Sequence, residues 1–524
     1  MRTGLIGFLA WLAWAAAAAS EQPEATAQSV NFDIWAYRID GNTVLGNEAL
    51  ERTVYPFTGP GKSIDAVEEA RKALEKAYHD GGYTTVLVDI PEQDVEEGLV
   101  VLQVTEGRVG RLNVTGSRYY SLGKIKEQVP ALAEGQVPHM PTVQKQLENL
   151  AEESQDRNVT PVMRAGQTPG KLDVELQVKD QLPLHGGVEL NSRNSSNTTL
   201  TRLIGSIRYD NLWQLQHSAS LQYQVSPQNS DQVEVWSGTY ALPLGFWDSR
   251  LAFYGVGISS NTDISTAGAM SVVGTGEIYG LRLVKPFGSD PNLFHSLTLG
   301  FDYKDFGQSI VTGADNQASP IHYAPFMLGY DLVHRGEQRM SSLDLGLHFS
   351  IQGLGNNPQE FADKRYNAKP DYMYFTLEFK HQEILPYDLR LLVRGNGQIT
   401  DTPLISNEQF SAGGPTSVRG YHQTEVLGDD GLSGSLELYT PKLLDSEYIQ
   451  EIRALGFVDG ARLWVLQPLK GSPAGYHLAS AGAGFRMRAF NRFINELDWS
   501  YPFVGINKVA VGEQRIDFRV AYEF

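Results

Sequence analysis

The sequence predicts an all-β transmembrane barrel of sixteen antiparallel strands, preceded by two small α+β domains. Three features of the chain support this prediction: a front region that repeats itself, a long region in which polar and apolar residues alternate, and an aromatic last residue. The composition agrees, since 52 glycines and 10% aromatic residues among 524 suit a turn-rich β protein. A net charge of -18 argues against nucleic acid as the main partner, because phosphate binding needs a basic surface.

The first twenty residues have the pattern of a secretory signal peptide. Arg2 gives a basic start, an apolar stretch covers residues 5–14, and an alanine run ends at Ala19. We therefore expect residues 1–20 to be removed and a short N-terminal segment to cover residues 21–31. No later segment approaches the ~20 apolar residues of a membrane-spanning helix. Insertion into a membrane would then require a closed barrel, the other fold that satisfies every backbone group in lipid.

Residues 32–107 and 108–182 look like one domain written twice. In each copy a strand is followed by two helices and a hairpin. The same markers return after 74 to 76 positions: Gly41 and Gly116, Val67 and Val143, and the Leu-Gln-Val triplets over 102–104 and 176–178. Three separate markers at one period indicate an internal repeat.

The periodicity also predicts the individual elements of both copies. In the first copy we expect a strand over 32–39, helices over 47–54 and 65–79, and a hairpin over 84–90 and 99–105. In the second we expect a strand over 109–114, helices over 124–129 and 142–153, and a closing strand over 173–178. This order, with Gly-Asn or Gly-Ser after the first strand, resembles the POTRA domains of outer-membrane transporters. The open alternative is two α+β domains of unknown purpose.

Alternation of polar and apolar residues dominates the chain from residue 183 to residue 524. The segments 214–225, 342–351 and 515–524 keep a strict period of two. Such alternation over about ten residues is typical of transmembrane barrel strands, which are apolar toward lipid and polar toward the lumen. The 342 residues of this region allow about 21 for each of sixteen strands with its connection, and ~9–11 of them span the membrane. A soluble β-sandwich is the alternative, although its strands are usually shorter.

The end of the chain carries a second signal. Its alternating strand closes on an aromatic residue, which resembles the recognition signal of bacterial outer-membrane barrels. The residues of this signal are Phe518, Val520, Tyr522 and Phe524.

Two motifs narrow the barrel to one family. The stretch over 410–421, Phe-Ser-Ala-Gly-Gly-Pro-Thr-Ser-Val-Arg-Gly-Tyr, closely resembles the sixth extracellular loop of two-partner secretion transporters (TpsB, haemolysin secretion/activation type). These are members of the outer-membrane assembly-factor superfamily. The resemblance implies that the loop folds into the lumen and that its tip meets an acidic motif on the inner wall. The tip is Val418, Arg419, Gly420 and Tyr421, and the wall motif is Phe457 and Asp459.

Elementary chemistry supports this pairing. Arg419 keeps its charge, and its planar fork suits bidentate pairing with a carboxylate. Phe457 and Asp459 are two positions apart, so on a strand their side chains point to the same side. The usual family pattern, Phe-x-Asp-x-Gly, ends here on Ala461, which leaves the local backbone path open. If Arg419 and Asp459 pair, alanine at either position should give the same phenotype.

The resemblance implies a transporter of the bacterial outer membrane, with its POTRA domains in the periplasm. Its main partner would be a secreted TpsA-like exoprotein of the adhesin, haemolysin or toxin type. Outer-membrane lipid and, during biogenesis, the barrel assembly machinery would be further partners. Two alternatives stay open: an insertase or assembly factor of the same superfamily, and a passive porin or adhesin.

The residues themselves point away from catalysis. There is no His-Glu-x-x-His run, no Gly-x-Ser-x-Gly elbow and no phosphate-binding loop, so we expect no enzyme, metal or cofactor. The absence of cysteine excludes thiol chemistry. The Gly-Asp-Asp-Gly run over 428–431 lacks the spaced oxygen ligands of a calcium loop and is interpreted as a turn. Many TpsB proteins begin with a helix that plugs the lumen. Residues 21–31 would make a helix of roughly 15 Å, too short for a ~30 Å hydrocarbon core, so we expect no plug.

Overall fold

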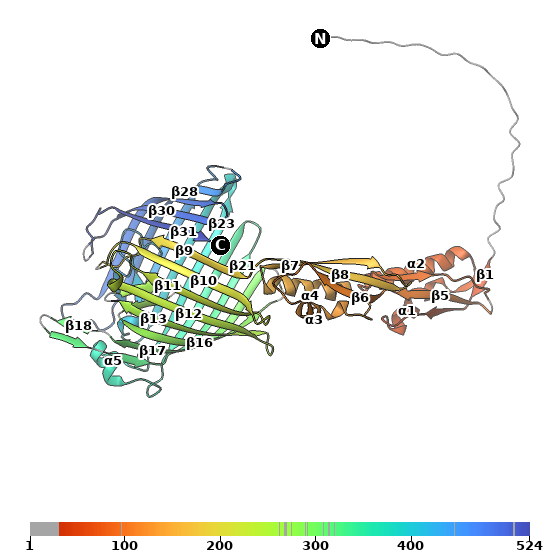
Figure 1. Ribbon diagram of the computed structural model, residues 1–524, viewed down its shortest axis with the longest axis horizontal. Helices are drawn as coiled ribbons and strands as arrows, with labels where there is room; N and C mark the ends of the chain where they lie inside the picture. Colours follow the sequence, from red (N-terminus) through yellow and green to blue (C-terminus); the bar gives the residue numbers. More distant parts are fainter. Residues whose placement is uncertain are drawn as a thin grey trace, which may run out of the picture. The chain divides into compact units, whose positions relative to one another are not determined.

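The computed structural model describes residues 31–524 except 96, 197, 261–262, 267–269, 274, 289, 291, 308, 313–314, 319, 445 and 507–508. The predicted signal peptide over 1–20, and all but the last residue of the segment over 21–31, lie outside the described residues. The chain divides into two compact units, Met1–Asp180 and Gln181–Phe524 (Figure 1). Among the described residues, no helix is long and apolar enough to cross a membrane.

The first unit contains two copies of one α+β topology. The first copy consists of β1 (Phe32–Ile34), β2 (Ala36–Asp40), α1 (Asn47–Val54), η1 (Tyr55–Phe57), β3 (Gly59–Lys62), α2 (Ile64–Asp80), β4 (Val86–Asp89) and β5 (Leu99–Glu106). The second consists of β6 (Arg108–Thr115), α3 (Leu122–Glu127), η2 (Pro130–Leu132), α4 (Met140–Glu153), β7 (Arg157–Ala165) and β8 (Lys171–Asp180). The sheet orders, β2-β5-β4 and β6-β8-β7, are equivalent. The central strand, β5 or β8, is parallel to β2 or β6 on one side and antiparallel to β4 or β7 on the other.

One expectation for this unit is wrong. The strand predicted over 32–39 is interrupted at Trp35, whose N–H donates to the carbonyl of Gly98 at 2.7 Å. As a result β1 pairs with β3, whereas β2 pairs with β5. Alternation of residue types cannot show such a break, because it continues through a residue that changes partner strand.

The glycines that mark the repeat occupy equivalent turns. Gly41 follows β2 and Gly116 follows β6, both with positive φ, +92° and +85°. A Cβ added at either would lie 2.2 Å from the carbonyl oxygen of Val104 or 2.3 Å from that of Val178. Both the backbone conformation and the close approach of a neighbouring strand therefore require glycine at these positions.

A carboxylate closes each of these turns. Glu106, the last residue of β5, accepts hydrogen bonds from the N–H and the hydroxyl of Thr43, both at 2.5 Å. Asp180, the last residue of β8, accepts from the N–H groups of Arg118 and Tyr119, both at 2.8 Å. Burial by itself raises the pKa of Asp180, but the N–H donors together with the Ser117 hydroxyl, which donates at 2.8 Å, outweigh it and hold the pKa below its usual value. Both copies of the repeat are thus stabilised in the same way, by a carboxylate at the end of the last strand that accepts hydrogen bonds from the turn after β2 or β6.

The second unit is a closed antiparallel barrel of sixteen strands, as predicted. Its strands are β9 (Leu184–Asn191), β10 (Arg202–Leu212), β11 (His217–Val225), β12 (Val233–Leu244), β13 (Ser249–Ser260), β16 (Thr275–Phe287), β17 (Leu293–Gly307), β20 (Ile321–Tyr323) continued by β21 (Phe326–Arg335), β22 (Arg339–Phe349), β23 (Met373–Leu385), β24 (Leu389–Thr400), β27 (Asp430–Tyr439), β28 (Ile449–Trp464), β29 (Gly475–Ala489), β30 (Phe493–Pro502) and β31 (Arg515–Glu523). Both β20 and β21 pair with β17, so they form one interrupted strand. β31 pairs with β9 and closes the barrel. Two small hairpins, β14 (Asp263–Thr266) with β15 (Met270–Val273) and β18 (Ser309–Thr312) with β19 (Asp315–Ala318), lie in the connections.

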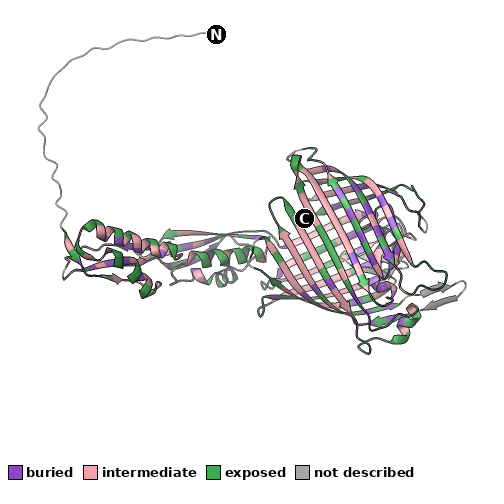
Figure 2. Ribbon diagram, turned by 180° about the vertical axis from the view of Figure 1, so that it is seen from behind, coloured by how far each residue is buried: buried purple, intermediate pink, exposed green. Residues whose placement is uncertain are grey.

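The predicted alternation of faces is present along the barrel strands (Figure 2). Leu221 of β11 and Ile516 of β31 point outward and are 54% and 61% exposed. Gln222 and Gln224 line the interior. The outer surface is therefore apolar and the inner surface polar, as a lipid-embedded barrel requires.

The strand predicted over 214–225 begins later than expected. Residues 213–216 form a tight turn, in which Trp213, Gln214 and Gln216 have φ near +60°, and β11 begins at His217. The Gln-Leu alternation of this segment continues the strand pattern by composition alone. The reversal is instead fixed by the end of β10 at Leu212, whose register partner is His217.

Candidate functional site: a loop folded into the barrel

The connection between β24 and β27, residues 401–429, folds into the barrel and is called L6. It contains η5 (Ser406–Glu408) and a short hairpin of β25 (Phe410–Ala412) and β26 (Val426–Gly428). The residues between these two strands, 413–425, form the tip. They lie against the inner wall, as the following contacts show.

Arg419 at the tip is 1% exposed and pairs with Asp459 on β28. Its Nε lies 2.7 Å from Oδ2 and its Nη2 lies 2.8 Å from Oδ1, which is a bidentate pair. The backbone N–H of Arg419 also donates to Oδ2, at 3.1 Å. The guanidinium carbon lies 3.5 Å from the ring centre of Phe457, so the cation stacks on the aromatic face. The four predicted features (tip, arginine, phenylalanine and aspartate) are brought together.

Two further carboxylates meet the same arginine. Nη2 of Arg419 donates to Glu437 of β27 at 3.0 Å, and its Nη1 lies 3.9 Å from Asp498 of β30. Each of these acids has a second cation: Arg394 lies 2.5 Å from Glu437, and Arg486 lies 2.8 Å from Asp498. The tip therefore sits in a balanced network of three guanidinium groups and three carboxylates.

Glu437 and Asp498 are not among the site residues predicted from the sequence. Both are buried polar residues of barrel strands, with 2% and 5% exposure. A signal did exist, because each lies on the polar side of an alternating strand. Which charges of sixteen strands face one point of the lumen depends on register and strand tilt, neither of which the alternation contains.

The other tip residues pack against the wall. Val418 and Tyr421 are fully buried, and the Tyr421 hydroxyl lies 2.8 Å from the carbonyl of Val504 and 3.0 Å from that of Ala479. Gly420 has φ +92° and lies beside Ser500. Ala461, where the family pattern has glycine, continues β28 without a break and packs in the apolar cluster that holds Val418 and Tyr421.

The interpretation of 428–431 as a turn is wrong. β26 ends at Gly428 and β27 begins at Asp430, and the N–H of the residue between them, Asp429, donates to the carbonyl of Trp464 at 2.8 Å. Asp429 is fully buried and receives the guanidinium of Arg365. Gly and Asp are common in turns, but here they join two strands around a buried carboxylate.

The predicted C-terminal residues lie at the closing seam. Tyr522 and Phe524 are 44% and 50% exposed, whereas Phe518 and Val520 are half-buried. Phe524 follows β31, and its backbone exchanges two hydrogen bonds with Gly186, at 2.9 and 3.0 Å. Their role as an assembly signal stays a prediction.

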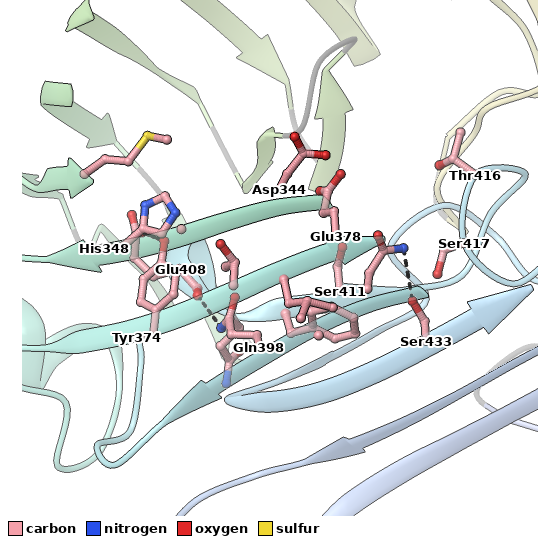
Figure 3. A pocket seen from close by; sticks show the side chains of 18 of the residues that line it. Asp344, His348, Tyr374, Glu378, Gln398, Glu408, Ser411, Thr416, Ser417 and Ser433 are labelled. Atoms are coloured by element: carbon pink, nitrogen blue, oxygen red, sulfur yellow. Dashed lines mark hydrogen bonds between the residues drawn. The ribbon is translucent and has the colours of Figure 1, made fainter. Parts of the chain in front are cut away.

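A polar cavity of about 1070 Å³ occupies the lumen beside L6. In Figure 3, Asp344 and Glu378 reach into it from the strands of the wall, and Ser411, Thr416 and Ser417 of L6 form another part of its lining. The cavity is lined by side chains of both charge signs, among them Arg282, Lys304, Asp344 and Glu378.

A sixteen-stranded barrel with two POTRA-like domains before it and a loop folded into its lumen defines the class of outer-membrane POTRA-barrel transporters. The family described as haemolysin secretion/activation protein ShlB/FhaC/HecB matches residues 170–487, more than half of the chain, and the ShlB-type POTRA domain matches residues 32–107. The chain therefore belongs to the ShlB/FhaC/HecB family. Its place is the outer membrane, with the POTRA domains in the periplasm.

Similar proteins agree in class. The outer membrane transporter CdiB of Dickeya dadantii is 21% identical over 76% of this chain and 71% of its own length. The heme/hemopexin transporter protein HuxB of Haemophilus influenzae is 20% identical over 74% of this chain and 68% of its own. Among solved structures, CdiB from Escherichia coli superposes with a TM-score of 0.63 at 20% identity, covering 96% of this chain and 93% of that one. BamA from Haemophilus ducreyi lacking POTRA domains 1–3 gives 0.57 at 18% identity, with 94% and 100% covered.

Proposed function

We propose that this chain recognises one large exoprotein in the periplasm and exports it to the cell surface by two-partner secretion. In this proposal residues 32–107 and 108–182 are the two POTRA domains and residues 183–524 form the barrel. The observation that carries it is the buried network around Arg419, at the tip of a loop that occupies the lumen. A passive porin needs no such charge-paired obstruction, whereas a pore that opens for one cargo does.

Open sheet edges in the POTRA unit support cargo capture. β2 and β6 each stand at the end of a three-stranded sheet and pair with one neighbour in that sheet. Part of the outer edge of β6 is occupied, because Val109 exchanges backbone hydrogen bonds with Gly135 and Gln136 at 2.7 and 2.8 Å and the N–H of Leu112 donates to Glu134 at 3.3 Å. The opposite edge strand, β7, contains Pro161, which lacks an N–H donor, so β2 is the better candidate edge. An extended cargo segment would add to such an edge through main-chain hydrogen bonds.

The barrel then provides the route. The cargo would cross the polar lumen as an unfolded chain, and its folding outside would supply the drive in place of nucleotide hydrolysis. Cargo of the adhesin, haemolysin or toxin type is what the family suggests. Outer-membrane lipid surrounds the apolar outer face, and the barrel assembly machinery would insert the barrel by recognising Phe518, Val520, Tyr522 and Phe524.

Co-expression tests the proposal. The chain is expressed with the large repeat-rich protein encoded beside it, and the medium is assayed for that protein. We expect release with the intact chain and none after deletion of residues 32–107, while the deleted form still inserts as a heat-modifiable barrel. Undiminished release from the deleted form would contradict the role assigned to the first POTRA domain.

The same experiment addresses the insertase alternative. The likeness to BamA concerns the fold alone. An insertase would change the abundance of other outer-membrane barrels when it is depleted, and it would release nothing into the medium. An exporter would leave those barrels unchanged.

A further inference from the structure

L6 has a second attachment, at its base. Asp429, the last residue of the loop, is fully buried and pairs with Arg365 of the connection between β22 and β23 (residues 350–372, called L5). Nη2 of Arg365 lies 2.6 Å from Oδ2, and Nη1 contacts Oδ1. The same guanidinium donates to the carbonyl of Leu404 in L6 and, at 3.0 Å, to that of Leu466 in the connection over 465–474, called L7. One arginine thus joins three outer loops.

The Asp429 carboxylate is occupied on every side. Besides Arg365, it accepts the backbone N–H groups of Leu404 at 2.8 Å and Leu466 at 2.7 Å. The amide of Gln409 donates to it at 3.2 Å. A buried carboxylate with this many donors is held in one position.

A second buried acid, Glu408, holds the N-terminal part of the base of L6, residues 401–412. Glu408 is 4% exposed and accepts from Lys304 at 2.7 Å, from the Tyr323 hydroxyl at 2.5 Å and from the Tyr374 hydroxyl at 2.7 Å. Its carbonyl also receives the amide of Gln398 at 3.0 Å, the bond drawn beside Glu408 in Figure 3.

An apolar core packs beneath these two acids. L5 contributes Phe361 of its helix α5 (Pro358–Lys364), and L6 contributes Leu404 and Ile405, all at most 1% exposed. The strands and the rest of L5 complete a cluster of thirteen buried residues: Val233, Val235, Ile258, Ile278, Phe306, Ile321, Tyr323, Phe361, Ala368, Tyr372, Tyr374, Leu404 and Ile405. The base of L6 is therefore part of a packed core inside the outer half of the barrel.

The tip is held differently. It borders the luminal cavity through Thr416, Ser417 and Gln423. Within the described part of the chain, the Ser417 hydroxyl and the Gln423 side-chain oxygen have no hydrogen-bond partner. Val418 and Tyr421 of the tip pack in a cluster of eight buried apolar residues, smaller than the cluster of thirteen at the base. The other attachments of the tip are ion pairs and hydrogen bonds, and water can replace these.

We propose that L6 works as a hinged loop, in which the base stays clamped to L5 and L7 during export and the tip over 413–425 alone moves. The inference rests on the proposed export function. Opening the base would withdraw Leu404 and Ile405 from a core of thirteen buried residues and uncover two buried carboxylates, with no nucleotide-driven step to supply the work. Releasing the tip exchanges ion pairs for water and withdraws Val418 and Tyr421 from the smaller cluster of eight. Arg365 and Asp429 are thus positioning residues for the moving tip.

The cysteine-free chain permits a direct test by cross-linking. At the base, Asn367 of L5 and Gln467 of L7 are both exposed, and their side chains meet at 2.6 Å. At the tip, the N–H of Gln423 donates to the carbonyl of Asn194 at 3.0 Å. In the double variants Asn367→Cys with Gln467→Cys, and Asn194→Cys with Gln423→Cys, the two cysteines are joined by a short bis-methanethiosulfonate. Each thiol displaces a methanesulfinate and forms a disulfide with the reagent, and a reductant cleaves the cross-link. Each cleaved sample is the control for its own cross-linked form.

We expect the base cross-link to leave secretion of the co-expressed exoprotein equal to that of the cleaved sample. The tip cross-link should reduce it to the level of cells without the transporter, and cleavage should restore it. Loss of secretion with the base cross-link, or full secretion with the tip cross-link, would overturn the hinge. Channel openings in planar bilayers provide a second measurement without cargo: the tip cross-link should suppress them and the base cross-link should not. The hinge is therefore tested even if no cargo is exported.

A charge variant tests the clamp itself. Arg365→Met keeps an unbranched apolar stem but leaves Asp429 without its cation, so protease added outside intact cells should cleave within 401–412. Arg365→Lys should restore protection only in part, because an ammonium group cannot reach Asp429, Leu404 and Leu466 together. An unchanged cleavage pattern in Arg365→Met would show that the base is not clamped by this residue.

Discussion

The two ends of L6 use the same kind of ion pair with different numbers of partners. At the tip, Arg419 and Asp459 belong to a network of three cations and three anions, next to a cluster of eight apolar residues. At the base, Arg365 and Asp429 form one pair, next to a core of thirteen apolar residues. When one charged residue of a shared network is removed, some of the remaining charges keep a partner. When one residue of an isolated buried pair is removed, the other charge keeps none. The number of partners around an ion pair therefore decides whether the pair can open during export, as we propose for the tip, or stays closed, as we propose for the base.

The largest effect should come from the base. In Asp429→Ala the Arg365 cation loses the carboxylate with which it pairs, and the N–H groups of Leu404 and Leu466 lose their acceptor. Removing one partner of a buried pair costs ~3–5 kcal/mol. The unfolding free energy of the refolded barrel in detergent, measured by denaturant titration, should fall by about this amount.

Asp430→Ala is the matched control for that variant. Asp430 is the next residue and accepts one backbone N–H, from Thr400 at 2.8 Å. Its loss should cost about 0.5–1.5 kcal/mol, the value of one ordinary hydrogen bond. Equal losses of unfolding free energy in the two variants would show that the Asp429 ion pair adds nothing beyond one ordinary hydrogen bond.

A smaller loss of stability, with a larger loss of secretion, is expected from the tip. In Arg419→Ala, Glu437 keeps Arg394 and Asp498 keeps Arg486, whereas the buried Asp459 loses its cation and keeps the backbone N–H of residue 419. The space left by the shorter side chain can admit water to Asp459, so the cost should lie below the ~3–5 kcal/mol of an isolated pair. Insertion should persist while secretion falls and channel gating becomes noisier. A loss of stability equal to that of Asp429→Ala would show that the tip network is as hard to break as the base pair, which contradicts the hinge.

Asp459→Ala should be milder than Arg419→Ala. The arginine would still have Glu437 at 3.0 Å and Asp498 at 3.9 Å. The sequence predicts equal phenotypes, because it identifies one partner only; the structure predicts unequal ones. Secretion from the two single variants and from the double variant decides between them, and the double variant should resemble Arg419→Ala.

A still smaller effect is expected from Tyr421→Phe. It removes the hydroxyl that bridges the carbonyls of Val504 and Ala479 and keeps the buried ring. One such bond contributes about 0.5–1.5 kcal/mol. Channel openings should become slightly more frequent in planar bilayers, with secretion nearly unchanged. A phenotype as strong as that of Arg419→Ala would mean that the tyrosine, rather than the arginine, holds the tip.

The smallest effect concerns the segment before the first POTRA domain. If L6 is the main obstruction of the lumen, removal of residues 21–31 should leave channel conductance unchanged. A large rise in conductance would show that this segment blocks the pore, and the two ends of L6 would then not account for closure.

Much of the fold could be predicted because it is written in local periods. The repeat and the period-two alternation are set by neighbours in the chain, and they correctly predicted two α+β domains and a sixteen-stranded barrel. The predictions were wrong where the course of a strand depends on a residue of another strand or loop. The break at Trp35 depends on Gly98, and the start of β11 depends on the end of β10.

The site was predictable only in the part that a family motif covers. Arg419, Phe457 and Asp459 stand in recognisable patterns, and the structure places them in contact. Glu437 and Asp498 join them only because β27 and β30 face the same part of the lumen. Arg365 and Asp429 lie 64 positions apart in connections whose folding no periodicity describes.

The most direct test of the central claim is a pair of distances measured by pulsed electron resonance in the cysteine-free chain. Spin labels at Thr416→Cys and Gln467→Cys report on the tip, and labels at Asn367→Cys and Gln467→Cys report on the base. An unfolded N-terminal fragment of the co-expressed exoprotein is then added to the protein in lipid bilayers. The account predicts that the distance between 416 and 467 shifts and broadens while that between 367 and 467 stays the same. A shift in the second distance, or none in the first, would contradict it.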